Sequence, residues 1–234
     1  PEQLLKGVKI AYSSTLGYVQ VDREVEETVR KAAHLLQSLG AEITEVAPGF
    51  DDPLAAFGHL FYGGAANALR DIGKKQRMMM DSQLVAVSEK AARLSMLDYL
   101  EAVNERMALC ERMAMFHKKY DLLLTPTLPI TAFEAGREVP QDWPSTRWPS
   151  WTPYTYPFNL TGQPGISVPC GFSSGGLPIG LQLVAARYND VAVLRAAHAY
   201  QQAAPLTDKR PQLFYADSSE SAAEGGQYRE DSEA

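Results

Sequence analysis

Residues 159–184, NLTGQPGISVPCGFSSGGLPIGLQLV, hold two apolar segments separated by a short run of serine and glycine. The apolar segments cover residues 166–172 and 177–184, and residues 173–176 lie between them. Apolar runs of this length on either side of a Ser/Gly group are typical of two strands joined by a tight turn. The stretch therefore predicts a hairpin-like pair of strands.

Toward the N-terminus, the sequence predicts a strand, a helix and a second strand. Strand-like segments lie at residues 8–12 and 42–46, and Asp22 and Gly40 stand where a helix between them would begin and end. In that helix, apolar residues recur at steps of three and four: Val25, Val29, Ala32, Leu36 and Leu39. We expect a βαβ unit with two parallel strands under a covering helix.

A helix is also predicted within residues 51–68. It would begin after Asp52, which is followed by proline and a largely apolar run. We expect Phe57, Leu60 and Phe61 to form its buried stripe.

A longer helix is predicted over residues 95–119. Ser95 and Asp98 have the spacing of a capping box at its start. Its apolar residues recur at helical spacing, and we expect them to form one packing stripe: Leu97, Leu100, Val103, Met107, Cys110 and Ala114.

Two more elements complete the predicted fold. Residues 120–127 are largely apolar and end near Pro126, which predicts a strand in the middle of a parallel sheet covered on both faces. Residues 189–204 predict a last helix, and its inner side would carry Val193, Ala196, Ala197 and Tyr200.

Residues 126–157 predict a long irregular loop. They hold seven of the fifteen prolines and all three tryptophans, without a helical or strand period. Three interpretations stay open for this loop: an active-site lid, a partner surface, or plain surface packing. Hydroxyl and amide groups next to large rings suit a mostly apolar pocket. The predicted pocket residues are Thr125, Thr127, Trp151, Tyr154, Tyr156 and Asn159.

The segments 166–169, 173–176 and 179–184 resemble the C-terminal half of the amidase signature family. Thr125, Pro126 and Thr127 match a TPT-like segment that lies near the substrate site in that family. The resemblance implies an α/β fold with a mixed, largely parallel central sheet covered by helices. It also implies a carboxamide or related acyl compound as substrate, and it does not separate a free amidase from an amidotransferase component.

The family's catalytic residues are a serine nucleophile, a second serine and a lysine, and the resemblance matches none of them to a residue here. The Gly/Ser-rich segment that carries both serines is missing, and residues 5–12 resemble the strand that follows it. We therefore predict no catalytic residue in this chain, and interpret it as a truncated or split amidase that is inactive alone. Residues 173–176 are better explained as a turn than as a nucleophile loop.

Two alternatives to this interpretation stay open. Cys170 would be a nucleophile if one of the four histidines approached it, although packing in the core is the favoured role. The second alternative is a non-catalytic module that keeps the fold and holds a ligand or partner with its Trp-rich loop.

Composition limits the partners. The net charge is −6, and residues after Tyr215 contribute −5 of it, so the remainder is nearly neutral and we expect no direct contact with nucleic acid. No apolar run approaches the roughly 20 residues of a membrane helix, so we expect no membrane contact. Two cysteines favour a reducing, cytoplasmic location.

Cofactors and metals are not expected, because the sequence has no GxGxxG, P-loop, HExxH or CxxC motif. Met78, Met79 and Met80 are consecutive and cannot share one helix face, so residues 73–81 are interpreted as gap-filling or loosely ordered rather than metal-binding. The expected partners are a small amide substrate and either the missing N-terminal half or a second copy of the chain.

Two regions are predicted along the chain. Residues 1–215 would be the amidase-like portion, and residues 216–234 an acidic, disordered tail that is poor in apolar residues.

Overall fold

The structure is a computed structural model that describes residues 4–206 of the 234. The chain divides into two units, residues 1–204 and 205–234. All described helices and strands belong to the first unit, and of the second only Pro205 and Leu206 are described. The predicted tail over residues 216–234 lies outside the described residues, so that boundary stays a prediction.

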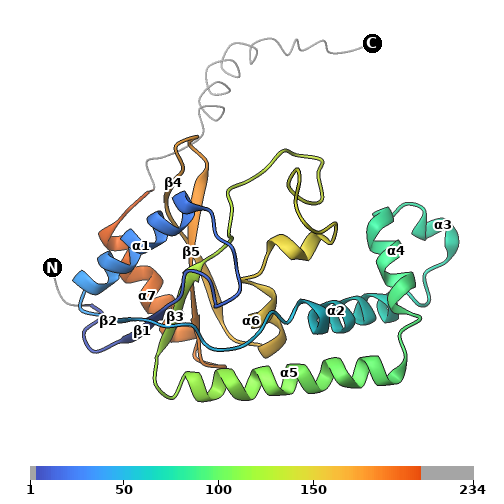
Figure 1. Cartoon of the computed structure of the whole chain (residues 1–234), viewed down its shortest axis with the longest axis horizontal. Coiled ribbons are helices and arrows are strands. Elements are labelled where there is room, and N and C mark those ends of the chain that lie inside the picture. Colours follow the sequence, from blue (N-terminus) through green and yellow to red (C-terminus); the bar gives the residue numbers. More distant parts are fainter. Residues whose placement is uncertain (1–3, 207–234) are drawn as a thin grey trace, which may run out of the picture. The chain divides into compact units, whose positions relative to one another are not determined.

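A five-stranded sheet forms the centre of the first unit, with the strand order β2-β1-β3-β5-β4 (Figure 1). The strands are β1 (Lys9–Tyr12), β2 (Glu42–Glu45), β3 (Leu122–Pro126), β4 (Gly165–Phe172) and β5 (Pro178–Ala185). β1 pairs in parallel with β2 and β3, whereas β5 pairs antiparallel with β3 and β4. The α/β class is confirmed, but the expectation of a largely parallel sheet is corrected, because half of the strand pairs are antiparallel.

The reason for this mixture is the hairpin of β4 and β5, which the sequence predicts correctly. Its turn is closed by a hydrogen bond from Ser173 N to Leu177 O at 2.8 Å, and Gly176 has a φ of +77°, which favours glycine. A tight turn forces β4 and β5 to run in opposite directions. Because β5 also pairs with β3, the hairpin adds two antiparallel pairs to the predicted parallel unit.

Helices α1 (Arg23–Ser38) and α7 (Asp190–Ala203) cover one face of the sheet. Both begin and end close to the predicted positions, and the Asp22 side chain accepts a hydrogen bond from Glu24 N at 2.8 Å. Val193, Ala197 and Tyr200 are buried against β4 and β5, as predicted.

The other face packs against a second core, to which α2 (Leu54–Ala68), α5 (Met96–Phe116) and α6 (Tyr156–Thr161) contribute. The alternation of β3 explains why both faces are apolar: Leu122 and Leu124 belong to the first core, and Leu123 belongs to the second. All five residues of β3 are buried, as expected for a central strand. The short helix α6 was not predicted.

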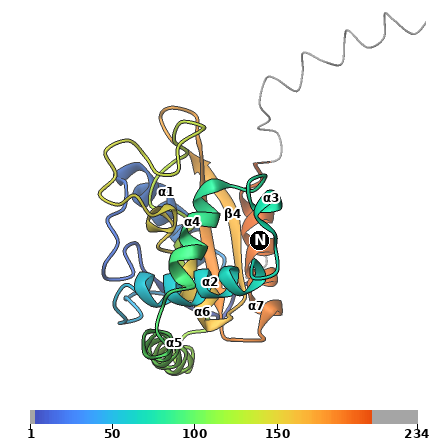
Figure 2. The ribbon, with the colours of Figure 1, turned by 90° about the vertical axis from the view of Figure 1, so that its right-hand side faces the viewer.

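α3 (Lys74–Arg77) and α4 (Ser82–Ala91) lie at the far ends of α2 and α5, away from the sheet (Figures 1 and 2). The expectation of a loosely ordered segment over residues 73–81 is therefore corrected in part, because α3 is helical. Met78 and Met79 are exposed by 78% and 88%, so they do not fill gaps in a core.

The predicted buried stripe is right in part for α2, where Leu60 also packs against the second core, and wrong for α5. In α2, Phe57 is buried but Phe61 is 44% exposed. In α5, the capping box of Ser95 and Asp98 is confirmed. The buried residues of that helix are however Ala102, Leu109, Met113 and Phe116, not the predicted stripe.

Candidate functional site

An open cleft of about 580 Å³ lies between the irregular segment that follows β3 and the β4–β5 hairpin. Its lining is mostly apolar, with Leu128, Ile130, Phe133 and Ile179 among its residues. Two of the predicted pocket residues, Thr127 and Trp151, line this cleft. A mostly apolar hollow with a few polar groups is the usual form of a small-molecule site.

The hydroxyl groups of Thr127 and Ser167 meet in the cleft wall at 2.7 Å. Thr127 is held in place by its backbone N–H, which donates to Gly180 O at 2.9 Å. A Cβ at position 180 would lie 2.8 Å from Thr127 Oγ1 and 3.0 Å from Ser167 Oγ, so any larger residue there would force the two hydroxyls to shift. The strand pairing thus places two polar groups, the hydroxyls of Thr127 and Ser167, in an otherwise largely apolar wall of the cleft.

Glu134 and Arg137 bring opposite charges to the cleft. Arg137 Nε lies 2.9 Å from a carboxylate oxygen of Glu134, and both side chains are largely exposed to solvent. The described residues that line the cleft include no histidine, lysine or cysteine. The cleft can therefore bind a molecule with apolar and polar parts, and the one carboxylate among its described lining residues, Glu134, is paired with Arg137.

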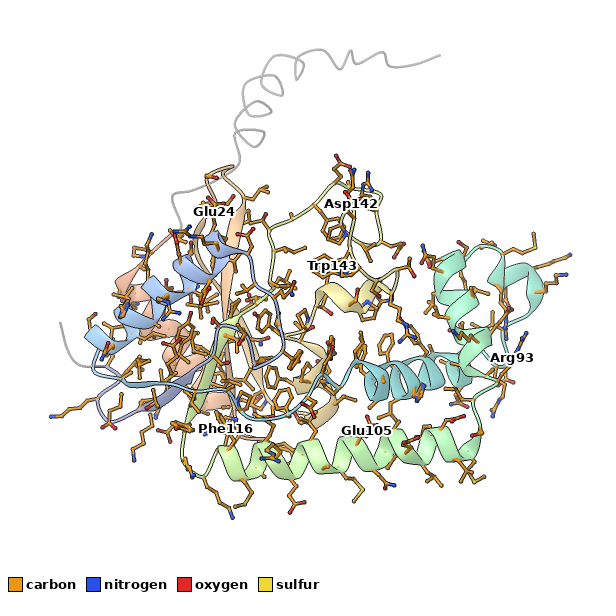
Figure 3. All side chains as sticks on the ribbon, in the orientation of Figure 1. Glu24, Arg93, Glu105, Phe116, Asp142 and Trp143 are labelled. Carbon is orange, nitrogen blue, oxygen red and sulfur yellow. The ribbon has the colours of Figure 1, made fainter. Side chains whose placement is uncertain are left out.

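The aromatic loop beside the cleft is packed. Trp151 donates from Nε1 to Glu138 O at 3.1 Å, and its ring contacts Phe133 edge-on with centroids 5.2 Å apart. Trp143 donates from Nε1 to Ser150 Oγ at 2.9 Å, and Figure 3 shows it on the loop that stands apart from the sheet. These contacts suit a lid or a packed surface rather than a disordered segment.

Thr125 belongs to a buried hydrogen-bond network next to the cleft, not to its lining. The Gln182 side-chain amide donates to Tyr154 O at 2.7 Å and to Thr125 Oγ1 at 3.2 Å. This network joins β3, β5 and the segment before α6. The sequence analysis missed Gln182, although a single amide within the apolar run of β5 could have indicated a buried polar contact.

Tyr154 and Tyr156 are buried in the second core. The Tyr154 hydroxyl donates to Ser14 O, and the Tyr156 hydroxyl donates to Asp52 Oδ1 at 2.6 Å. Burial raises the pKa of both phenols, so both stay protonated at neutral pH. Asn159 lies on the exposed side of α6. The structure therefore brings only Thr127 and Trp151 of the six predicted residues to the cleft.

Cys170 has the environment of a core residue. Its side chain packs against the first core, and Sγ lies 3.4 Å from Ile179 O. Burial raises the pKa of the thiol to about 12. A thiol that stays protonated at neutral pH is a poor nucleophile.

His117, at the end of α5, joins this helix to the start of β4. The Gln163 side-chain amide donates to Ala185 O and lies 2.8 Å from His117 Nε2. His117 Nε2 must therefore accept, which leaves Nδ1 to donate to Tyr120 O at 3.0 Å. Burial lowers the pKa of His117, as suits a neutral ring.

Residues 4–206 hold neither a cluster of metal-ligating side chains nor a helix that could span a membrane. There, no group of three or more histidine, cysteine, aspartate or glutamate residues could hold a metal ion. None of the helices in this range has the length and hydropathy to cross a membrane.

Comparison with known proteins identifies the family. The profile of the Amidase family matches residues 2–194. The chain is 32% identical over 213 residues to an acylamidase of Rhodococcus erythropolis, covering 88% of this chain and 44% of that protein. It is 35% identical over 216 residues to a glutamyl-tRNA(Gln) amidotransferase component of Prochlorococcus marinus (strain MIT 9211), covering 82% of this chain and 44% of that protein.

The fold agrees with this result. The structure of a bacterial aryl acylamidase from the amidase signature family matches with a TM-score of 0.75 at 24% identity, covering 88% of this chain and 47% of that one. The chain spans about half the length of the curated relatives it matches. On the extent of the profile match and the identity to its relatives, the chain belongs to the amidase family.

Proposed function

We propose that this chain is the C-terminal part of an amide-hydrolysing enzyme, in which it supplies the sheet, one wall of the substrate pocket and a lid. The observation that carries the proposal is the cleft beside Thr127. It offers apolar surface, a pair of hydroxyl groups and an aromatic cover in a chain of the amidase family.

We further propose that the chain is inactive alone. Hydrolysis of an amide requires a nucleophile, a base and donors for the developing oxyanion. The hydroxyls of Thr127 and Ser167 bond to each other, and no lysine or histidine lines the cleft among the described residues. The nucleophile and its base would come from a segment that corresponds to the other half of the relatives' length.

The proposed substrate is a carboxamide with an apolar acyl group. The apolar residues of the cleft would bury the acyl group, while Thr127, Ser167 or Arg137 would contact the polar end. One relative bears the name acylamidase. We also propose a cytoplasmic location, because Cys110 and Cys170 are both unpaired.

The test is ammonia release from a panel of simple carboxamides. It is measured on the purified chain, and on a fusion in which the uncovered segment of the Rhodococcus acylamidase precedes the chain. The control is the same fusion with the nucleophilic serine of that segment changed to alanine.

The proposal is supported if the fusion releases ammonia and the isolated chain does not. The activity of the fusion should be lost in the alanine control and reduced by Thr127→Ala. Activity of the isolated chain would overturn the proposal of inactivity alone. A folded fusion that releases no ammonia, and that still binds a carboxamide such as benzamide, would favour the alternative of a non-catalytic binding module built around the Trp-rich loop.

A further inference from the structure

A second hollow, of about 480 Å³, lies among α2, α3, α4 and the short segments that follow them. Figures 1 and 2 show α3 and α4 at the end of the first unit that is farthest from the sheet. We call it the arginine hollow, because Arg70, Arg77 and Arg93 line it. Among the described residues, it shares no lining residue with the cleft beside Thr127.

Ser88 lines the arginine hollow with a hydroxyl group that has no partner. It is the one buried residue of α4, at 2% exposure. Its Oγ accepts and donates no hydrogen bond among the described residues. Buried polar groups are nearly always hydrogen-bonded. An unpartnered hydroxyl in the wall of a hollow therefore indicates that the hollow receives a polar ligand.

The guanidinium group of Arg77 is fixed beside this hydroxyl-bearing wall. Its Nε donates to Ile72 O at 2.9 Å, and its Nη2 donates to Leu69 O at 2.6 Å. The third nitrogen, Nη1, makes no hydrogen bond among the described residues and lies 3.9 Å from Glu89 Oε1, beyond hydrogen-bond distance. Two backbone carbonyls thus hold the group in place and leave one oriented donor for a ligand.

The other two arginines of the hollow are nearly free of partners. Arg93 makes no ion pair and no side-chain hydrogen bond with another described residue, and Figure 3 shows it just beyond α4, at the outer end of the molecule. Arg70 pairs only with its neighbour Asp71, at 3.6 Å, and both side chains are largely exposed. An exposed pair of this kind contributes little. Both guanidinium groups can therefore turn to a ligand.

The charge of the lining indicates the class of ligand. Three arginines and one glutamate line the hollow, which gives a formal charge of +2. A phosphate monoester carries a charge of about −1.5 to −2 at neutral pH and has three strong acceptor oxygens. A carboxylate has a single charge and two oxygens, which one guanidinium group can satisfy. The arginine hollow offers donors from three separate segments, so the phosphate group suits it better.

We propose that the arginine hollow binds a small phosphate monoester, with the phosphate group between the three arginines and the Ser88 hydroxyl. The volume leaves room for an organic group, which Leu69 and two alanines of the lining would contact. This site needs no residue of the cleft and is independent of the proposed amide hydrolysis.

The first experiment is isothermal titration calorimetry of the chain with phenyl phosphate, and with benzoate, which has the same ring and a carboxylate in place of the phosphate group. We expect saturable binding of phenyl phosphate and a weaker affinity for benzoate. Arg93→Gln and Arg70→Gln should each raise the dissociation constant for phenyl phosphate roughly tenfold, because each removes a charge-assisted contact. The matched control is Arg195→Gln, an exposed arginine of α7 outside the hollow, which should bind like the wild type.

Glu89→Gln tests the same site in the opposite direction. Glu89 is the one acidic residue among the described residues that line the hollow, and it would repel a bound phosphate group. Its replacement should lower the dissociation constant for phenyl phosphate several-fold. A variant that has lost its fold cannot give this result.

Ser88→Ala separates a binding role from a structural one. Because the hydroxyl has no partner in the chain, thermal denaturation without ligand should give a melting temperature equal to or above that of the wild type. The increase in melting temperature that phenyl phosphate produces should be smaller in the variant than in the wild type.

Four results would overturn the proposal. They are a wild-type chain that shows no saturable binding of phenyl phosphate at millimolar concentration, a benzoate affinity equal to that for phenyl phosphate, and a control variant Arg195→Gln that weakens binding as much as Arg93→Gln. The fourth is a Ser88→Ala variant that melts well below the wild type without ligand, since the hydroxyl would then serve the fold.

Discussion

Replacement of Gln182 with methionine tests whether the buried network beside the cleft stabilises the fold. Methionine has nearly the same shape as glutamine but cannot donate a hydrogen bond, so the change removes the donor without opening a cavity. In the wild type, Gln182 Nε2 donates to Tyr154 O at 2.7 Å and to Thr125 Oγ1 at 3.2 Å. Gln182 is 7% exposed, and both Thr125 and Tyr154 are fully buried.

The expected cost follows from these two contacts. A buried carbonyl left without a donor costs about 1–3 kcal/mol, and the loss of an ordinary hydrogen bond costs about 0.5–1.5 kcal/mol. The contact to Thr125 is the longer one, and Thr125 Oγ1 still donates to Pro126 O at 2.8 Å. We therefore expect the free energy of unfolding to fall by roughly 2–3 kcal/mol, most of it from the Tyr154 carbonyl.

The assay is reversible urea unfolding at one fixed protein concentration, because association would shift the apparent stability. The midpoint should fall with an unchanged slope, and the melting temperature should drop by roughly 4–12 °C for a chain of this size. Gln201→Met, at an exposed position of α7, is the matched control and should change little. A loss below about 0.5 kcal/mol for Gln182→Met, no larger than a typical surface change, would refute the reasoning.

Three further predictions concern single residues. Burial lowers the pKa of His117 in the folded chain, so the contribution of this residue to stability should be complete above about pH 6.5 and decline as the pH falls below that value. The His117→Gln variant should therefore show a flatter pH dependence of the urea midpoint. A pH dependence equal to that of the wild type would contradict this prediction. Gly180→Ala would place a Cβ 2.8 Å from Thr127 Oγ1, and it should lower the free energy of unfolding, measured by thermal denaturation, by about 1–3 kcal/mol. A variant as stable as the wild type would argue against the tight contact. Burial raises the pKa of the Cys170 thiol to about 12. At pH 8, Cys170 should therefore react with a thiol-specific disulfide reagent far more slowly in the folded chain than in urea. Equal rates in the two conditions would show that the fold does not protect the thiol.

Much of the fold could be predicted because its signals are local. Asp22 caps α1, Ser95 and Asp98 form the capping box of α5, and the Ser/Gly turn joins β4 and β5, each within a few residues of its partner. Such signals depend on hydrogen bonds and backbone preferences between near neighbours. α6 escaped prediction because six residues are too few to show a helical period.

The candidate site was predicted less well. The sequence indicated hydroxyls and rings around residues 125–159, and Thr127 and Trp151 do line the cleft. Tyr154 and Tyr156 have the same composition as a pocket lining, but they pack in the second core. A ring looks alike in sequence whether it faces a ligand or another side chain, so the sequence could not separate the two cases.

By itself, the sequence determined the order of most helices and strands, the turn of the hairpin and the family to which the chain belongs, since each depends on spacing along the chain. Only the tertiary structure decided that β5 runs antiparallel to β3, that Gln182 meets the Tyr154 carbonyl, and which apolar stripe of α5 is buried. The predicted stripe of α5 and the stripe that is buried both have helical spacing. The buried stripe is the one that segments distant in sequence cover. That choice is made by contacts between residues far apart in the chain, which no local pattern records.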